Sequence, residues 1–288
     1  MKNNKVIILK LGGSLLSDKT KPFSFREKCF SRIVKEIVES SEKISENLII
    51  VHGGGSFGHP VANEYQIQLG HNKNIDNQNY GLGLTHLRMQ ELNFKVTSKF
   101  MKQKIPVMSL SPVDLFFKNN KNLKFTGVKQ IENLLQNGII PILFGDVLLH
   151  SQNNFSILSG DRIIAELCSS LAKFSVSQVI FATDQDGIIK NFENEQKDYQ
   201  SENNTSNLGT INPELIKQAT IEELKHLDLE SFNGKIDVTG GLDGKIDNIE
   251  LIFKNKKTIS ICLINGLRKN YIKKALLNEE IPRTQIFP

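Results

Sequence analysis

The stretch "KVIILKLGGS", residues 5–14, joins a short apolar run to a pair of glycines. An apolar run of this length that ends at a turn signal is typical of a strand buried on both faces. Helical periodicity follows within residues 24–43, and a second apolar run, "NLIIV", occupies residues 47–51. The order strand, helix, strand predicts a parallel sheet, because parallel neighbours need a crossover connection.

The same alternation continues through the rest of the chain. Helical spacing predicts helices over residues 85–103, 128–138, 160–172 and 213–227, and a glycine loop that feeds a helix over 239–255. Apolar runs predict strands over residues 105–110, 139–146, 176–184 and 258–264. Two asparagine-rich segments without periodicity, 70–83 and 190–209, are interpreted as loops or hairpins. The fold class is therefore predicted as α/β around a mainly parallel sheet.

Bulk composition narrows the function classes. The 288 residues suit one large domain or two closely joined ones, and the net charge of +5 comes from scattered lysines. Such a surface suits an anionic small substrate as well as plain solvation, and we expect neither nucleic acid nor a membrane as partner. Cys29, Cys168 and Cys262 are far apart and form no CxxC pair, which predicts reduced thiols. The apolar run before Gly12 is too short for a signal peptide or a membrane span, so we expect a cytoplasmic protein.

Four glycine-bearing junctions punctuate the alternation: "LKLGGSLL", "VHGGGSFGH", "ILSGDR" and "TGGLDGK". Glycines at strand ends and helix starts let backbone N–H groups approach an anion, and several such junctions on one sheet edge suggest a nucleoside triphosphate. Each alone is more often a tight turn. "GGLDGKI" has one residue too few for a Walker loop and lacks Ser or Thr after Lys245, while "GLGLTH", residues 81–86, is interpreted as a loop.

Three lysines accompany these junctions. Lys10 precedes the first glycine pair, Lys19 ends "SLLSDK", and Lys245 ends the last glycine loop. Phosphoryl transfer needs positive charge on the phosphates, although any single lysine is usually solvated surface. Lys10 stands out because it ends a buried strand, where a charge requires a partner.

Taken together, these motifs resemble the amino acid kinase superfamily. Its pattern of K-x-G-G-S, H-G-G-G, G-D and T-G-G-M-x-x-K corresponds to residues 10–14, 52–55, 145–146 and 239–245. Within the superfamily, "HGGGSFGHPVA", "LLSDK" and "SGD" resemble the isopentenyl phosphate kinases, with His59 as the specific feature. Fosfomycin kinases share that histidine and are the nearest alternative.

The resemblance implies a three-layer α/β/α sandwich, ATP and Mg²⁺ as requirements, and a homodimer. It implies a single domain over residues 1–288, with an acceptor-binding lobe over about 1–170 and an ATP-binding lobe over about 171–288. The implied catalytic residues are Lys10, Lys19 and His59. The implied ATP-binding residues are Lys10, Gly12, Gly13, Ser14, Gly55, Asp184, Gly241 and Lys245, and those for the acceptor are Gly54, His59 and Gly160. The metal ligands stay open.

Several residues keep two interpretations at this point. His52 is favoured as a satisfied core histidine and His59 as a ligand of the acceptor phosphate. Asp146 and Asp161 could orient Lys10, help organise Mg²⁺, or cap local structure. Arg162 stands where the family often has a second acid, and a long polar insertion follows "DGII".

Three functions compete on these grounds. The first is phosphorylation of isopentenyl phosphate, the second is phosphorylation of fosfomycin or a related phosphonate, and the third is nucleotide sensing without catalysis. A prenyl tail would need an apolar tunnel. The stripe Leu87, Leu92, Val96 and Phe100 on helix 85–103 could line it or could simply be core.

Overall fold

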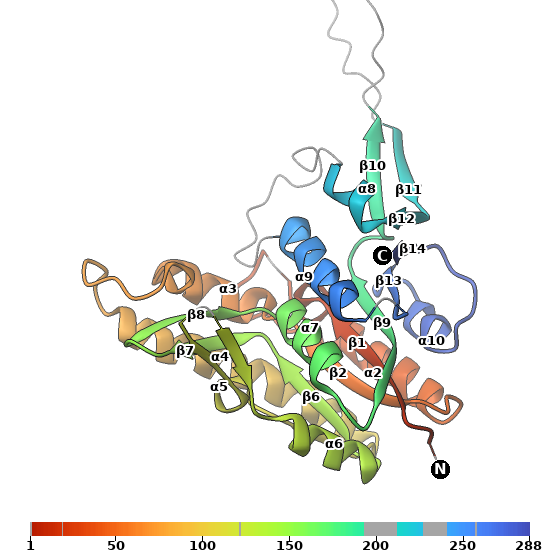
Figure 1. Cartoon of the computed structure of the whole chain (residues 1–288), viewed down its shortest axis with the longest axis horizontal. Helices are drawn as coiled ribbons and strands as arrows, with labels where there is room; N and C mark the ends of the chain where they lie inside the picture. The colour runs from red at the N-terminus through yellow and green to blue at the C-terminus, as the bar shows by residue number, and fades with distance from the viewer. Residues whose placement is uncertain (1, 19, 121, 193–211, 227–240, 257) are drawn as a thin grey trace, which may run out of the picture.

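An eight-stranded sheet forms the centre of the molecule, in the order β12-β14-β13-β9-β1-β2-β6-β3 (Figure 1). The computed structural model describes residues 2–18, 20–120, 122–192, 212–226, 241–256 and 258–288. Neighbouring strands run parallel except β13 with β14, which confirms the mainly parallel sheet. The strands are β1 Lys5–Leu11, β2 Asn47–His52, β3 Val107–Ser109, β6 Ile140–Phe144, β9 Ser175–Thr183, β12 Gln218–Thr220, β13 Ser260–Asn265 and β14 Thr284–Phe287.

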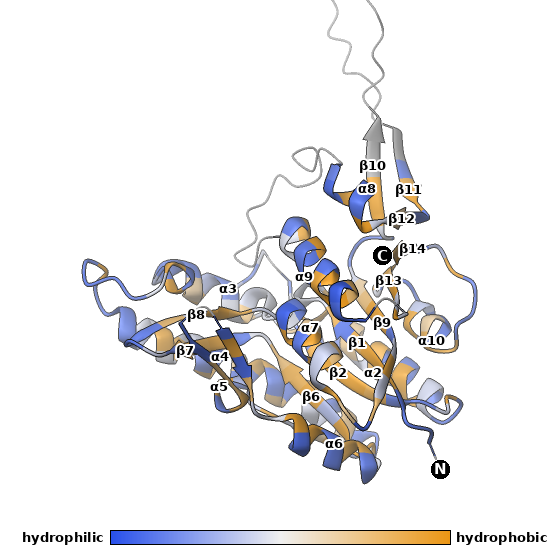
Figure 2. Cartoon of the chain, viewed as in Figure 1, coloured by the Kyte–Doolittle hydropathy of each residue, from blue (hydrophilic) through white to orange (hydrophobic). Residues whose placement is uncertain are grey.

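Helices cover both faces of this sheet, which confirms the three-layer sandwich. On one face the core includes side chains of α6 Val128–Gln136, α7 Gly160–Ser170, α8 Ile221–His226 and α9 Gly241–Asn255. On the other it includes side chains of α1 Gly13–Leu16, α2 Glu27–Ser41, α3 Gly55–Glu64, α4 Gln78–Lys102 and α10 Tyr271–Leu276. Figure 2 shows apolar colour concentrated on the central strands and on the helix faces turned toward them.

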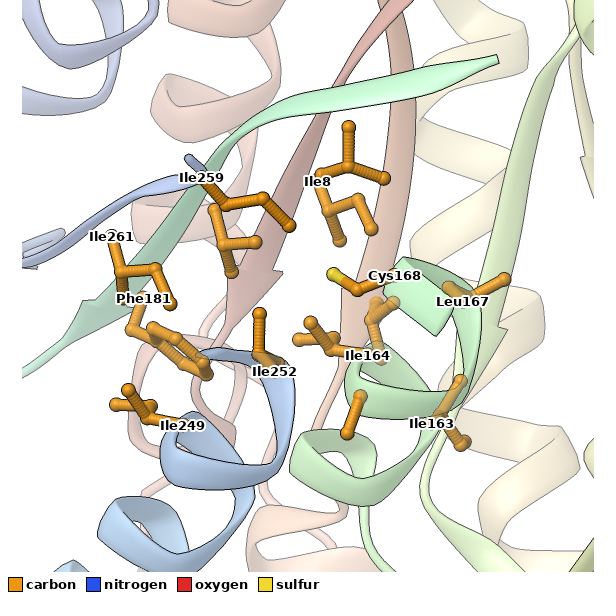
Figure 3. Packing of buried hydrophobic residues seen from close by; sticks show 14 of the residues in the cluster. Ile8, Ile163, Ile164, Leu167, Cys168, Phe181, Ile249, Ile252, Ile259 and Ile261 are labelled. Atoms are coloured by element: carbon orange, nitrogen blue, oxygen red, sulfur yellow. The ribbon is translucent and has the colours of Figure 1, made fainter. Parts of the chain in front are cut away.

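The central strand β1 divides its side chains between the two layers. Ile7, Leu9 and Leu11 belong to the cluster that contains α2 and α4, whereas Val6 and Ile8 belong to the cluster that contains α7 and α9. Figure 3 shows Cys168 of α7 between Ile8 and Ile164, and the Phe181 ring close to Ile249 of α9. Because side chains alternate with a period of two, the next even-numbered residue, Lys10, is directed toward the α7 and α9 layer.

Strands of a second sheet and a hairpin extend this core. The four-stranded sheet has the order β5-β4-β7-β8 and was not predicted. Its strands are β4 Phe116–Asn119, β5 Asn122–Phe125, β7 Asp146–His150 and β8 Asn154–Leu158. The short helix α5 Pro112–Leu115 directly precedes β4, and the 3₁₀ turn η1 Ile67–Leu69 contacts β8. β10 Ile188–Phe192 pairs antiparallel with β11 Asn212–Ile216. The hairpin interpretation of 190–209 therefore holds to residue 192, and the remainder lies outside the described residues.

Two local predictions were wrong. The helix predicted over 213–227 is helical only over Ile221–His226, because the preceding residues pair with β10 and β14 as strands β11 and β12. "GLGLTH" lies inside α4, which begins at Gln78, and is no loop. A Cβ on Gly81 would lie 2.0 Å from the Tyr65 ring, so this glycine allows close packing of the helix instead of marking a turn.

Candidate active site

Two of the predicted glycine loops lie in direct backbone contact at the carboxyl ends of β1 and β2. A Cβ on Gly13 would lie 2.3 Å from the Gly55 nitrogen, and a Cβ on Gly53 would lie 3.0 Å from the Gly13 nitrogen. Gly53 N–H donates to Leu11 O at 3.0 Å, and Gly55 has φ +48°. Side chains at Gly13 or Gly55 would separate the loops, so the glycines give two chain segments one shared surface.

Ser17 fastens the two loops together, a role that the sequence did not indicate. Its hydroxyl donates to Gly13 O at 3.0 Å and accepts from Ser56 N–H at 2.8 Å. Gly12 N–H donates to Ala182 O of β9 at 2.8 Å. The first glycine pair is therefore held both to the second loop and to the neighbouring strand.

The third glycine junction brings a helix N-terminus to the same place. Gly145 N–H donates to His52 O at 3.0 Å, and a Cβ on Gly145 would lie 3.3 Å from the Gly160 nitrogen. Gly160 opens α7, and a Cβ on it would lie 3.6 Å from Lys10 Cε. The Ser159 hydroxyl caps the helix by accepting from Arg162 N–H at 3.1 Å. The positive end of the α7 dipole therefore lies beside Lys10.

A charged centre of three side chains lies under these loops. Lys10 Nζ donates to Asp161 Oδ1, and Lys245 Nζ donates to Asp161 Oδ2 at 3.1 Å. The side chains of Lys10, Asp161 and Lys245 are only 12%, 9% and 11% exposed. The structure thus brings together Lys10 from β1, Asp161 from α7 and Lys245 from α9, which confirms that Asp161 orients Lys10.

The electrostatics of this centre favour an anion. Burial lowers the pKa of Lys10 to about 8, against the attraction of Asp161. Burial alone would raise the pKa of Asp161, but Lys10 and Lys245 lower it to about 2. Two ammonium groups share one carboxylate, so among the described residues one positive charge has no matching negative charge at a nearly buried position. Such a charge is costly unless an anion approaches it, as a phosphate does.

The other predicted site residues are distributed around this centre. Ser14 is buried in α1, Gly241 opens α9 with φ +57°, and Asp184 is exposed in the loop after β9. His59 is half-buried on α3, which continues from the glycine loop. Lys19 lies outside the described residues, as do residues 239–240 of the last motif.

His52 is a core histidine, as predicted. It is fully buried, its ring stacks on Phe144 at 5.5 Å, and burial lowers its pKa to about 4. Its Nδ1 lies 3.1 Å from Gly53 O and its Nε2 lies 3.3 Å from Asn93 Oδ1. The neutral ring can donate from Nδ1 to the glycine-loop carbonyl, so it supports the loop from below.

Asp146 does not orient Lys10, which corrects one of its interpretations. Its Oδ2 accepts instead from Nδ1 of His86 on α4, at 2.8 Å. No pattern singled out His86, because its partner is 60 residues away. Arg162, the departure from the family pattern, pairs with Glu166 of its own helix at 2.7 Å.

The four apolar residues singled out on α4 lie on two different faces of the helix. Leu92, Val96 and Phe100 are fully buried, and Phe100 packs edge-on against Phe30 of α2 at 6.1 Å. The core interpretation is therefore confirmed for these three, and the tunnel interpretation is wrong for them. Leu87 is 49% exposed on another face of the helix.

Among the described residues, no three His, Cys, Asp or Glu side chains gather where they could hold a metal ion. No helix in the described ranges has the length and apolar character needed to cross a membrane. Cys29, Cys168 and Cys262 are free thiols.

Comparisons with known proteins agree with this geometry. A model of the amino acid kinase family matches residues 5–265. Isopentenyl phosphate kinase of Methanothermobacter thermautotrophicus is 32% identical over 98% of both chains, and that of Methanocaldococcus jannaschii is 32% identical over 94% of this chain and 95% of the relative. A solved structure of isopentenyl phosphate kinase superimposes with a TM-score of 0.74 at 28% identity, covering 98% of this chain and 100% of that chain. The chain therefore belongs to the amino acid kinase family and, within it, to the group of isopentenyl phosphate kinases.

Proposed function

We propose that this chain transfers the γ-phosphoryl group of ATP to isopentenyl phosphate, which forms isopentenyl diphosphate and ADP. The observation that carries the proposal is the Lys10–Asp161–Lys245 centre beneath the joined glycine loops. Positive charge at this position suits phosphates, and the relatives at 32% identity support isopentenyl phosphate as the acceptor. A nucleotide sensor would not need two lysines held on one carboxylate.

The residues have distinct roles in this reaction. An oxygen of the acceptor phosphate attacks the γ-phosphorus while the bond to the ADP oxygen breaks, and negative charge moves onto that oxygen. Lys10 and Lys245 stabilise this charge, and Asp161 positions both ammonium groups. A general base is unnecessary, because the second pKa of a phosphate monoester is about 6 and the attacking oxygen is already ionised.

The side chains of the described residues limit how the protein could bind Mg²⁺. Both oxygens of Asp161 are engaged by lysines, and no cluster of three acids or histidines is present in the described ranges. Mg²⁺ commonly binds substrate phosphates and water with few protein ligands. An ion that enters with ATP would fit this arrangement, and it would supply positive charge to the phosphates.

We assign ATP to the lobe of residues 171–288 and the acceptor to that of residues 1–170. ATP would contact Lys10, Gly12, Gly13, Ser14, Gly55, Asp184, Gly241 and Lys245. The acceptor phosphate would contact Gly54, His59 and Gly160, and Lys19 would add catalytic charge. The free thiols agree with a cytoplasmic location, where thiols stay reduced.

The activity is tested with purified protein, ATP, Mg²⁺ and a panel of acceptors followed by phosphorus NMR. We expect diphosphate from isopentenyl phosphate and no product from isopentenol or amino-acid carboxylates. Product from fosfomycin alone would transfer the assignment to the phosphonate kinases. ATP binding without turnover of any acceptor would favour the sensor.

His59 provides a prediction specific to the acceptor. Replacing it with alanine removes a charge-assisted hydrogen bond to the acceptor phosphate, worth about 1.5–3 kcal/mol. The kcat/KM for isopentenyl phosphate should fall about ten- to hundredfold, while the Kd for ATP changes little. Acceptor kinetics and melting temperature are measured on one preparation. A folded His59→Ala protein with wild-type acceptor kinetics would contradict the role.

We also infer a homodimer, from one face of α4 and the edge of the main sheet. Exposed apolar side chains follow α4 at seven-residue intervals: Tyr80 (64%), Leu87 (49%), Phe94 (71%) and Met101 (57%). The neighbouring strand β3 is the last strand of the sheet, and its Met108 is 47% exposed. An apolar helix face beside an open sheet edge suits a twofold contact with a second copy.

Replacing Phe94 with aspartate should therefore convert a dimer to a monomer, because the charge would be buried at the centre of the α4 stripe. Light scattering coupled to size-exclusion chromatography measures the mass. Leu69→Asp is the matched control, since Leu69 is equally exposed at 71% but lies on η1. A wild-type monomer, or equal loss of dimer in both variants, would contradict this interface.

A further inference from the structure

An imidazole–carboxylate pair, His86 with Asp146, lies outside the charged centre. Asp146 is 1% exposed, and its Oδ1 accepts from Val147 N–H at 2.8 Å while its Oδ2 accepts from His86 Nδ1–H at 2.8 Å. The carboxylate therefore fixes the ring of His86 and engages its Nδ1. The atom of His86 that remains able to reach a ligand is Nε2, on a side chain that is 26% exposed.

The pair borders the half of the site assigned to the acceptor. Asp146 directly follows Gly145, which touches the ends of β2 and α7 as described above. His86 lies one helical turn before Met89, whose sulfur would lie 2.9 Å from a Cβ on Gly54 and 2.7 Å from one on Gly58. Because residues three apart share a helix face, His86 lies on the side of α4 that packs against the glycine loop.

A small apolar cluster lies on the other side of His86. It consists of Ala62, Ile67, Val147 and Phe155, with Leu82 among the side chains packed against it. Leu82 precedes His86 by one turn of α4, and Val147 follows Asp146 in β7. These side chains are buried core, so they hold α4 and β7 together behind the imidazole, which leaves His86 at the border of the glycine loop.

The charges around His86 favour its protonated form. Its hydrogen bond to Asp146 of β7 raises its pKa above the ordinary value, and Asp114 of α5 acts in the same direction, against partial burial. Burial raises the pKa of Asp146, and the hydrogen bond from His86 opposes that rise. A protonated His86 offers an N–H donor and a positive charge, and it screens a bound phosphate from the Asp146 carboxylate.

We propose that His86, oriented by Asp146, is a second acceptor-binding histidine whose Nε2–H donates to the phosphate of the acceptor. This inference rests on the proposed function. His59 on α3 and His86 on α4 then hold the acceptor phosphate from two adjoining helices, and Asp146 is a positioning residue that acts through His86.

His86→Gln tests the proposal, because glutamine keeps a polar donor but loses the charge and the fixed ring. We expect the KM for isopentenyl phosphate and its Kd by calorimetry to rise about tenfold, with the KM for ATP within twofold of wild type. His150→Gln is the matched control. His150 lies on the same strand as Asp146 and bonds the Ser156 hydroxyl at 2.8 Å, and it should leave all constants unchanged.

Asp146→Asn provides a second measurement, the pH dependence of kcat/KM, which would not change if Asp146 had only a structural role. The amide cannot hold a proton on His86 as the carboxylate does, so the pKa of His86 should fall. The kcat/KM for isopentenyl phosphate should then begin to fall at a lower pH than in the wild-type enzyme. At pH 8 it should be about three- to tenfold below the wild-type value. His86→Gln should remove the His86 component of this pH dependence.

These experiments distinguish a failure of the His86 role from a failure of the proposed function. A wild-type enzyme that converts isopentenyl phosphate, with a His86→Gln variant of unchanged acceptor KM and Kd, overturns only the role of His86. An unshifted pH profile in folded Asp146→Asn overturns the coupling of the pair. A wild-type protein that does not use isopentenyl phosphate overturns the proposed function and this inference with it.

Discussion

Replacing Lys10 with alanine should lower kcat about a hundred- to thousandfold and weaken ATP binding much less. Lys10 is held on Asp161 beside the glycine loops. In the proposed reaction its charge would stabilise the negative charge that develops on the leaving oxygen. Contacts that strengthen in the transition state act on kcat, and losing one such donor costs about 2.7–4 kcal/mol. Lys245→Ala should have the same direction of effect, because its ammonium group shares the same carboxylate.

Single-turnover kinetics and calorimetric ATP binding separate the two quantities. Lys254→Ala is the matched control, since Lys254 lies on the same helix as Lys245 but has a side chain that is 65% exposed and pairs with Glu250. The control should retain wild-type kcat. Wild-type kcat in both Lys10→Ala and Lys245→Ala would remove the charged centre from the mechanism.

Replacing Gly13 with alanine should damage both the fold and the activity. The added Cβ would lie 2.3 Å from the Gly55 nitrogen and 2.5 Å from its Cα, so one glycine loop must move. Overpacking of this kind costs about 1–3 kcal/mol of unfolding free energy. Under the proposed function these loops would position the phosphates, so a displacement near 1 Å between them should lower kcat about a hundredfold.

Gly83→Ala makes the same substitution where the structure has room. Nothing lies within 4 Å of a Cβ on Gly83, which is inside α4. This variant should gain about 0.5–1 kcal/mol, because glycine is a poor helix former. Denaturant unfolding measures both variants. A Gly13→Ala protein as stable and active as wild type would show that the loops need no direct contact.

The periodic elements of the fold were predictable because their signal is local. The run at β1, the helix at α2 and the alternation that follows them were recognised from spacing alone. The helix predicted over 213–227 failed where the chain pairs as β11 and β12, since partners supplied by β10 and β14 decide that pairing. The second sheet was missed because its strands are short and alternate weakly in hydrophobicity.

Whether a site residue could be predicted also depended on whether its signal is local. Lys10 and the glycine junctions were identified because a charge that ends a buried strand and glycines at strand ends are visible in a linear pattern. His86 carried no such signal, and "GLGLTH" was misread because Tyr65, which makes Gly81 necessary, lies elsewhere in the chain.

By itself, the sequence determined the alternation of strands and helices and the placement of glycines at strand ends. Tertiary structure decided which charges meet. Asp161 is 151 residues from Lys10 and 84 from Lys245, yet its two oxygens bond both lysines. Periodicity directs a side chain to one face of its own element, whereas its partner depends on how elements from distant parts of the chain pack together. The same packing placed the Asp146 carboxylate against His86 and left Asp161 to hold the lysines.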